Sequence, residues 1–245
     1  MNAHAWCRSV TVTAGLMLLA VTSAGSIGAA PASVTTVVVK PSQDLAVLIR
    51  TQEAFSGPDQ HSAPVGLVQA RRPMTDEQTV LPVIGDGTGT DGLSWLHVML
   101  PGRPNGHTGW IRQRTTVQAA TGWHIVVYTS RPRVIVYRNG RQVRVFGAIV
   151  GKPSTPTPQG EFFVEEAVRL RPGDAGAPYA LALSARSNVL QEFAGGPGQI
   201  ALHGVANIGG VLGTAVSHGR VRLSTGAISW LGTRIGPGVP VTITP

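Results

Sequence analysis

The chain has 245 residues, which is enough for one large domain or two small ones with cores of their own. Its formal charge is +8, with twenty Lys and Arg against twelve Asp and Glu. These cations are scattered along the chain, and no basic stripe with interleaved aromatic residues is visible, which argues against a nucleic-acid-binding protein. The charge favours attraction to an anionic cell envelope, with an ordinary solvated basic surface as the alternative.

Residues 1–30 have the features of an export signal. Arg8 supplies a basic start, residues 10–21 form an apolar core, and Gly28-Ala29-Ala30 is a small-residue cleavage site. A retained membrane anchor is the alternative, but the apolar core is short for a membrane span. The only cysteine, Cys7, lies in this segment. Cleavage would therefore leave a secreted chain with neither disulfides nor thiol chemistry.

Residues 44–118, after a short linker at residues 31–43, are expected to form a small β-barrel. Short apolar runs alternate here with turn formers such as Gly57-Pro58 and Asn105-Gly106, a pattern typical of small all-β domains. The runs lie at residues 45–49, 65–68, 79–84, 95–100 and 109–111. The stretch from Trp95 to Gly102, followed by His107-Thr-Gly-Trp-Ile, resembles the closing hairpin of bacterial Src-homology-3-like domains, which bind peptides or glycan. Trp95 and Trp110 are also compatible with a purely structural role in a core.

Residues 122–245 are expected to form a second β-rich domain. Residues 124–128 and 134–137 have strand patterns, and Asn139-Gly140 predicts a hairpin into residues 142–150. Further strands are expected at residues 162–168, 179–183 and 239–243. A short helix is predicted at residues 187–193, and a second one from the N-cap Ser224 to Ile235. The predicted fold is therefore mostly β, with a small N-terminal barrel, a second β-rich domain and one or two short helices.

Two motifs in this second domain identify a family. The apolar run from Gln199 ends in His203-Gly204, and fourteen residues after His203 the chain reaches Ser217-His218-Gly219-Arg220-Val221-Arg222. This pair resembles the signature of the L,D-transpeptidase (YkuD-type) catalytic domain, a His-Gly at a strand end followed by Ser-His-Gly-Cys-Ile/Val-Arg. The proline-rich stretch from Gly151 to Phe162 resembles the element that lies near the active cleft of the same family, and its prolines stiffen the loop. The resemblance covers residues 122–245.

The resemblance implies a role for each site residue. His203 corresponds to the general base, oriented by a backbone carbonyl. His218 and Gly219 precede the nucleophile position, where backbone amides form an oxyanion hole. Ser217 is expected to bond a site histidine or to buttress the loop. Gly204 and Arg222 are expected to contact substrate, and stabilisation of the loop is the alternative role for Arg222.

The resemblance also implies a reaction and a location. The family's transferases join peptidoglycan stem peptides at the cell wall, through a cysteine acyl-enzyme and without a metal or an organic cofactor. The implied partners are peptidoglycan stem peptides, with no nucleic acid and no stable membrane insertion after signal cleavage. The preferred donor and acceptor peptides and the oligomeric state are left open.

Arg220 departs from the family pattern, because it stands where the family has its nucleophilic cysteine. A thiolate is the nucleophile in such catalysis, whereas a guanidinium stays protonated and has no lone pair to donate. Three interpretations stay open: a non-catalytic peptidoglycan-binding pseudoenzyme in which Arg220 holds stem-peptide carboxylates, a recent loss or sequence error, or an unconventional nucleophile elsewhere. Each predicts a chain that is inactive, or nearly so, through cysteine chemistry.

Other kinds of catalytic site fit the sequence less well. No Asp or Glu follows Glu192, so a Ser-His-Asp triad would need an acid from far upstream. His203 and His218 lack the close spacing, the cysteines and the nearby carboxylates of zinc sites. A serine hydrolase is therefore the weakest of the enzymatic hypotheses.

Overall fold

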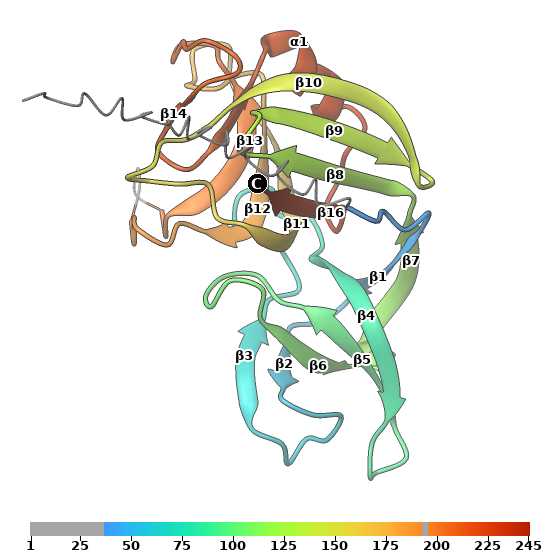
Figure 1. Cartoon of the computed structure of the whole chain (residues 1–245). Coiled ribbons are helices and arrows are strands. Elements are labelled where there is room, and N and C mark those ends of the chain that lie inside the picture. Colours follow the sequence, from blue (N-terminus) through green and yellow to red (C-terminus); the bar gives the residue numbers. More distant parts are fainter. Residues whose placement is uncertain (1–36, 193–195) are drawn as a thin grey trace, which may run out of the picture. The chain divides into compact units, whose positions relative to one another are not determined.

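The computed structural model describes residues 37–192 and 196–245 (Figure 1). The expected export signal and residues 31–36 of the expected linker lie outside the described residues. Residues Val37–Pro245 form one compact unit. Within the described ranges, no helix has the length and apolar character needed to cross a membrane.

The N-terminal part of this unit is a seven-stranded antiparallel sheet with the order β3-β2-β6-β5-β4-β1-β7. Its strands are β1 (Gln43–Leu48), β2 (Gln52–Phe55), β3 (Pro64–Val68), β4 (Val80–Thr88), β5 (Ser94–Met99), β6 (Thr108–Arg112) and β7 (Thr116–Thr121). A 3-10 turn, η1 (Gln113–Thr115), precedes β7. The apolar runs expected to form strands supply its core, including Leu48, Leu81 and Ile111.

The two tryptophans of the expected closing hairpin have different surroundings. Trp95 on β5 is fully buried, with the guanidinium of Arg112 4.3 Å from its ring centroid. Trp110 on β6 is half-buried and stacks on His97, with ring centroids 4.8 Å apart. Trp95 is therefore a core residue, which leaves Trp110 as the more accessible indole of this hairpin.

The rest of the unit is a closed eight-stranded barrel (Figure 1). Its strands are β8 (Trp123–Tyr128), β9 (Arg133–Arg138), β10 (Arg141–Gly151), β11 (Gly160–Arg169), β12 (Tyr179–Arg186), β13 (Gln199–Gly204), β15 (Val221–Leu223) and β16 (Pro240–Thr244), and β14 (Ala215–Ser217) adds to the edge of β10. The order β10-β15-β13-β12-β11-β16-β8-β9 closes through the β9–β10 pair. The β9–β10 turn is Asn139-Gly140, and both of its residues have positive φ, as a tight two-residue hairpin requires.

One α-helix, α1 (Thr225–Gly232), packs on the barrel core through Ala227, Ile228 and Leu231. It begins as the sequence predicts, because the Ser224 hydroxyl accepts a hydrogen bond from the Ala227 N–H. It ends at Gly232, three residues before the predicted end. Strands predominate in the part of the chain that the structure describes, and α1 is the only α-helix there, so the predicted mostly β fold class with one or two short helices is confirmed.

The prediction of a second helix at residues 187–193 is wrong for residues 187–192, and Phe193 lies outside the described residues. The Ser187 hydroxyl accepts hydrogen bonds from the N–H groups of Val189 and Leu190. A serine that bonds nearby backbone groups in this way offers the chain an alternative to the helical turn. This segment is a bend between β12 and β13.

Candidate active site

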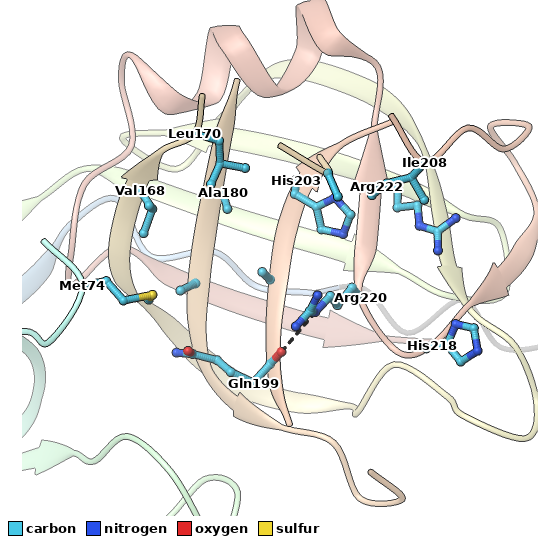
Figure 2. A pocket seen from close by; sticks show the side chains of 13 residues that line it. Met74, Val168, Leu170, Ala180, Gln199, His203, Ile208, His218, Arg220 and Arg222 are labelled. Carbon is cyan, nitrogen blue, oxygen red and sulfur yellow. Dashed lines mark hydrogen bonds between the residues drawn. The ribbon is translucent and has the colours of Figure 1, made fainter. Parts of the chain in front are cut away.

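The strands β11, β12, β13 and β15 line a cavity of about 460 Å³ on one side of the barrel (Figure 2). Most of its lining is apolar, and its polar groups are concentrated among a few residues. The apolar lining residues are Met74, Val168, Leu170, Ala175, Ala180, Ala182, Ala201 and Ile208, and the polar ones are Gln199, His203, His218, Arg220 and Arg222. The cavity is thus suited to a ligand that has an aliphatic part and a polar part.

His203 reaches the cavity because β13 alternates in the manner of a half-buried strand. Ile200 and Leu202 point into the barrel core, whereas Gln199, Ala201 and His203 line the cavity. The parallel β13–β15 pair places His203 opposite Arg222. The sequence pattern of β13 and the register of β15 therefore bring together two of the residues that the family resemblance singles out.

The imidazole of His203 is held in one orientation. Its Nδ1 donates a hydrogen bond to the Gly204 carbonyl at 2.9 Å, and since a carbonyl only accepts, Nε2 keeps its lone pair. Burial lowers the pKa of His203 to about 4, with the nearby Arg220 and Arg222 adding to the effect and the Gly204 carbonyl opposing it. The histidine is therefore neutral near pH 7 and has a basic nitrogen, as a general base or a hydrogen-bond acceptor requires.

Gly176, which no sequence motif indicates, makes this orientation possible. A Cβ atom at Gly176 would lie 2.5 Å from Nδ1 of His203, and the backbone there has φ of +90°. Only glycine accepts both conditions without strain. Gly204, which was expected to contact substrate, does not line the cavity: it is buried, its N–H donates to the Gly176 carbonyl at 2.7 Å, and its own carbonyl orients His203.

The buried, neutral state of His203 makes a testable contribution to the pH dependence of stability. Its folded pKa of about 4 lies below the ordinary value of 6.5, so the unfolded chain takes up this proton at the higher pH. The contribution of neutral His203 to the free energy of unfolding is therefore complete above the unfolded-state pKa of 6.5, and it is lost as the pH falls toward the folded-state pKa of about 4. From about pH 7.5 to about pH 5, the unmodified chain should lose roughly 2 kcal/mol of unfolding free energy more than His203→Gln.

Urea unfolding of both proteins at the two pH values measures this difference. His124, whose pKa burial also lowers to about 4, is present in both proteins, so its contribution cancels. Equal losses in the two proteins would show that His203 is not held neutral by burial.

The loop from Ser217 to Arg220 is closed by Ser217 itself. Ser217 is fully buried, and its hydroxyl donates to the Arg220 carbonyl. Gly219 is in the left-handed region with φ of +97°, which any other residue would adopt only with strain. Ser217 is therefore a buttress of the loop. Its hydroxyl is neither exposed to the cavity nor paired with any of the described histidines, which does not suit a nucleophile.

The proline-rich loop lies against the Ser217–Arg220 loop. The Ser217 carbonyl accepts hydrogen bonds from the Lys152 N–H at 2.9 Å and the Thr155 hydroxyl at 3.3 Å. The Thr157 hydroxyl in turn accepts from the Gly151 N–H at 2.9 Å. Thr155 and Thr157 are both buried. The proline-rich segment thus fixes the backbone that presents His218 and Arg220.

Arg220 and Arg222 form a cationic group beside His203 (Figure 2). The Nε of Arg220 donates to the Gln199 carbonyl at 3.4 Å, and burial together with Arg222 lowers the pKa of its guanidinium. The Nε of Arg222 is buried without a hydrogen-bond partner among the described residues. His218 is exposed at the cavity rim. No Asp or Glu occurs among the described residues that line this cavity, so an anionic group is the ligand chemistry that fits it.

The described residues contain no group of three or more His, Cys, Asp or Glu placed to hold a metal ion. The polar groups of the cavity are instead two guanidinia, two imidazoles and an amide. Guanidinia are cations themselves and match carboxylate or phosphate oxygens. The chemistry that these side chains offer is anion binding beside a neutral histidine.

Comparison with known proteins found similar solved structures and a matching family. Among solved structures, an L,D-transpeptidase from Mycobacterium smegmatis is 16% identical, with a TM-score of 0.41, over 66% of this chain and 96% of that chain. An L,D-transpeptidase from Mycobacterium tuberculosis H37Rv is 19% identical, with a TM-score of 0.44, over 68% of this chain and 90% of that chain. No curated protein matches the chain in sequence.

The family comparison rests on sequence and covers nearly all of the barrel. The family model described as the L,D-transpeptidase catalytic domain, YkuD, matches residues 122–243. This range begins just before β8 and ends inside β16, and it includes His203 and the Ser217–Arg222 motif. Residues 122–243 of this chain therefore belong to the L,D-transpeptidase catalytic-domain family.

Proposed function

We propose that this protein binds peptidoglycan stem peptides in the His203 cavity at the cell wall and does not transfer them by cysteine chemistry. Membership of residues 122–243 in a family that acts on peptidoglycan peptides supports the choice of ligand. The observation that carries the proposal is the position of Arg220, which follows Ser217-His218-Gly219 and lines the same cavity as His203. Cys7 is the only cysteine of the chain, so residues 8–245 contain no thiol.

Arg220 and Arg222 make this cavity suited to binding anions rather than to acyl transfer. A guanidinium cannot attack a carbonyl carbon, but it binds a carboxylate through charge-assisted hydrogen bonds. Stem peptides carry free carboxylates, and their alanine side chains are aliphatic. In the proposed complex a carboxylate lies against Arg220 and Arg222, and the aliphatic part lies along the apolar wall.

The location and the N-terminal module are part of the same proposal. An export signal at residues 1–30, a linker at residues 31–43 and a Src-homology-3-like module at residues 44–118 would deliver residues 122–245 to the wall. The antiparallel β5–β6 hairpin, with the half-buried Trp110 on it, supports the module assignment. Determining the N-terminus of the protein recovered from the culture medium tests the export signal, and an unprocessed N-terminus would contradict it.

Arg222→Ala is expected to weaken the binding of disaccharide-tetrapeptide fragments roughly 10- to 100-fold, as the loss of a charge-assisted bond implies. Titration calorimetry measures this change. Arg234→Ala is the matched control, because Arg234 is an exposed arginine whose guanidinium lies 4.7 Å from the ring centroid of Trp230. Fragments with an amidated C-terminus should also bind more weakly. Equal affinities of the unmodified chain and Arg222→Ala would contradict carboxylate binding at this position.

An impaired cysteine enzyme is the competing function, and the intact orientation of His203 is the observation that favours it. It shares the cavity, the ligand and the expected effect of a thiol at position 220 with the binding protein, but it predicts residual product formation by the unmodified chain. The two functions therefore differ in whether the unmodified chain forms a product from a bound fragment.

A further inference from the structure

One residue in the lining of the cavity comes from outside the matched domain. Met74, in the segment between β3 and β4, lines the cavity together with Val168 and Leu170 (Figure 2). It lies far outside the range 122–243 that matches the family. The N-terminal sheet thus supplies one of the apolar residues that a ligand of the barrel would meet.

The segment that carries Met74 has an ordered backbone of its own. Arg71 and Gln78 form a bridge, and the Arg72 N–H donates to the Glu77 carbonyl at 2.9 Å. The Asp76 N–H donates back to the Arg72 carbonyl at 3.0 Å. Residues 71–78, here called the Met74 loop, therefore form a compact turn.

The carboxylate of Glu166, on β11, binds the backbone at the tip of the Met74 loop. One carboxylate oxygen, Oε2, accepts the N–H of Met74 at 3.1 Å and both the N–H and the hydroxyl of Thr75, at 3.0 and 3.1 Å. Three hydrogen bonds to one buried anion fix the backbone on either side of the Met74 side chain. Glu166 is fully buried, so water does not compete for these bonds.

A neutral cluster of four charges surrounds this anchor. The Arg72 guanidinium pairs with Glu165 and, at 3.6 Å, with Glu166, and the Arg186 guanidinium pairs with Glu165 at 2.9 Å. Both carboxylates have no exposed side-chain surface. Consecutive residues of a strand normally point to opposite faces, but a register shift between Val164 and Glu166 interrupts the β11–β12 ladder here. This bulge explains how both carboxylates come to pair with the same arginine.

The cavity combines an apolar wall, which includes Met74, with the cationic group of Arg220 and Arg222, so it can hold the two parts of an aliphatic carboxylate. Figure 2 shows Met74 beside Val168 on one side of the cavity and Arg220 with Arg222 on another. A ligand whose carboxylate binds the arginines directs its aliphatic part to the other lining residues. A flexible methionine side chain at that wall adapts to the shape of an aliphatic group.

We propose that Met74 is a ligand-contacting residue that sets which aliphatic group the cavity accepts, and that Glu166 is the positioning residue that keeps Met74 there. The N-terminal sheet thereby takes part in ligand selection. This inference rests on the proposed function for the identity of the natural ligand, a stem peptide, but the role of the wall is tested separately with N-acetyl-leucine, which combines a carboxylate with an aliphatic side chain.

Methionine labelled with carbon-13 at its methyl group gives a direct test in the full chain. The chain has four methionines, and the loss of one signal in Met74→Leu assigns Met74. Met99, on β5 and not part of the cavity lining, is the internal control. Disaccharide-tetrapeptide and N-acetyl-leucine are added in turn, while the ring signal of His203, assigned with His203→Gln, reports occupation of the cationic end.

The expected result is a shift of the Met74 and His203 signals with both probes and no shift of Met99. If the tetrapeptide shifts neither signal and N-acetyl-leucine shifts both, the proposed function fails and the role of Met74 stands. If either probe shifts His203 without Met74, the inference is overturned. It is also overturned if N-acetyl-leucine shifts neither signal.

Two variants separate ligand selection from structural support. Met74→Ala should weaken N-acetyl-leucine binding about tenfold and N-acetyl-alanine binding less than threefold, since the longer side chain is the one that reaches this wall. The unfolding midpoint should not move, because Met74 is 54% exposed. Glu166→Ala should reduce the ligand-induced shift of Met74, and Glu166→Gln, which keeps an acceptor oxygen, should restore part of it. Equal weakening for both N-acetyl amino acids would contradict a selective role.

Discussion

The Arg220→Cys variant is expected to convert disaccharide-tetrapeptide fragments into cross-linked dimers, whereas the unmodified chain is expected to form none. The substitution places a thiol at a position that lines the cavity beside a neutral His203 whose Nε2 keeps its lone pair. Histidine can then take the thiol proton, and the thiolate can attack the donor peptide carbonyl. The peptide C–N bond breaks, the terminal residue leaves as an amine that takes the proton from histidine, and the amine of a second fragment then displaces the thiolate from the thioester to form the cross-link. The substitution also removes a cation that lowers the pKa of His203. Product formation should exceed that of the unmodified chain at least about 100-fold, measured by mass spectrometry.

Two variants serve as controls for this gain of activity. Arg220→Ser has a side chain of similar size to cysteine without a thiol, and it should remain inactive. Arg220→Cys combined with His203→Gln keeps the thiol but loses the base, so its rate should fall by roughly 100-fold or more. Dimers formed by Arg220→Ser would place the nucleophile elsewhere. An inactive Arg220→Cys protein that still folds would contradict the intact orientation of His203 as a catalytic base.

Glu165→Ala is expected to lower the free energy of unfolding by about 3–5 kcal/mol. Glu165 is buried and pairs with both Arg72 and Arg186, whose side chains are only 12% and 10% exposed. Its removal leaves the buried cluster with two cations against the single carboxylate of Glu166. An uncompensated buried charge is costly because the interior does not replace the lost solvation.

Urea unfolding of the full chain measures this loss. Glu53→Ala is the matched control, because Glu53 is an exposed glutamate on β2 and its replacement should change the free energy by less than about 0.5 kcal/mol. A Glu165→Ala protein as stable as Glu53→Ala would mean that water solvates the cluster. The ion pairs would then not stabilise the contact between the Met74 loop and the barrel.

Local sequence signals predicted much of the fold. Alternating apolar residues marked most strands, Asn139-Gly140 marked the β9–β10 hairpin, and Ser224 marked the start of α1. These features depend on residues close together in sequence. The segment at residues 187–192 was misassigned because the side chain of Ser187 competes with the helical backbone, an outcome that apolar spacing does not reveal.

The candidate site was predictable in part. The histidine-glycine motifs indicated His203, His218, Arg220 and Arg222, all of which line one cavity. Gly176 and Met74 gave no such signal, because their importance comes from contacts with segments 27 and 92 residues away along the chain, at His203 and Glu166. The bulge that aims Glu165 and Glu166 at the same arginine likewise depends on the pairing of β11 with β12.

The unmodified chain is expected to bind stem peptides and to leave them unchanged. Equilibrium dialysis of the purified protein against disaccharide-tetrapeptide, followed by mass spectrometry of the bound and free fractions, measures binding and turnover in one sample. We expect retention of the fragment at unchanged mass and loss of that retention in Arg222→Ala. A cross-linked dimer, a fragment shortened by its terminal residue, or no retention by the unmodified chain would contradict this expectation.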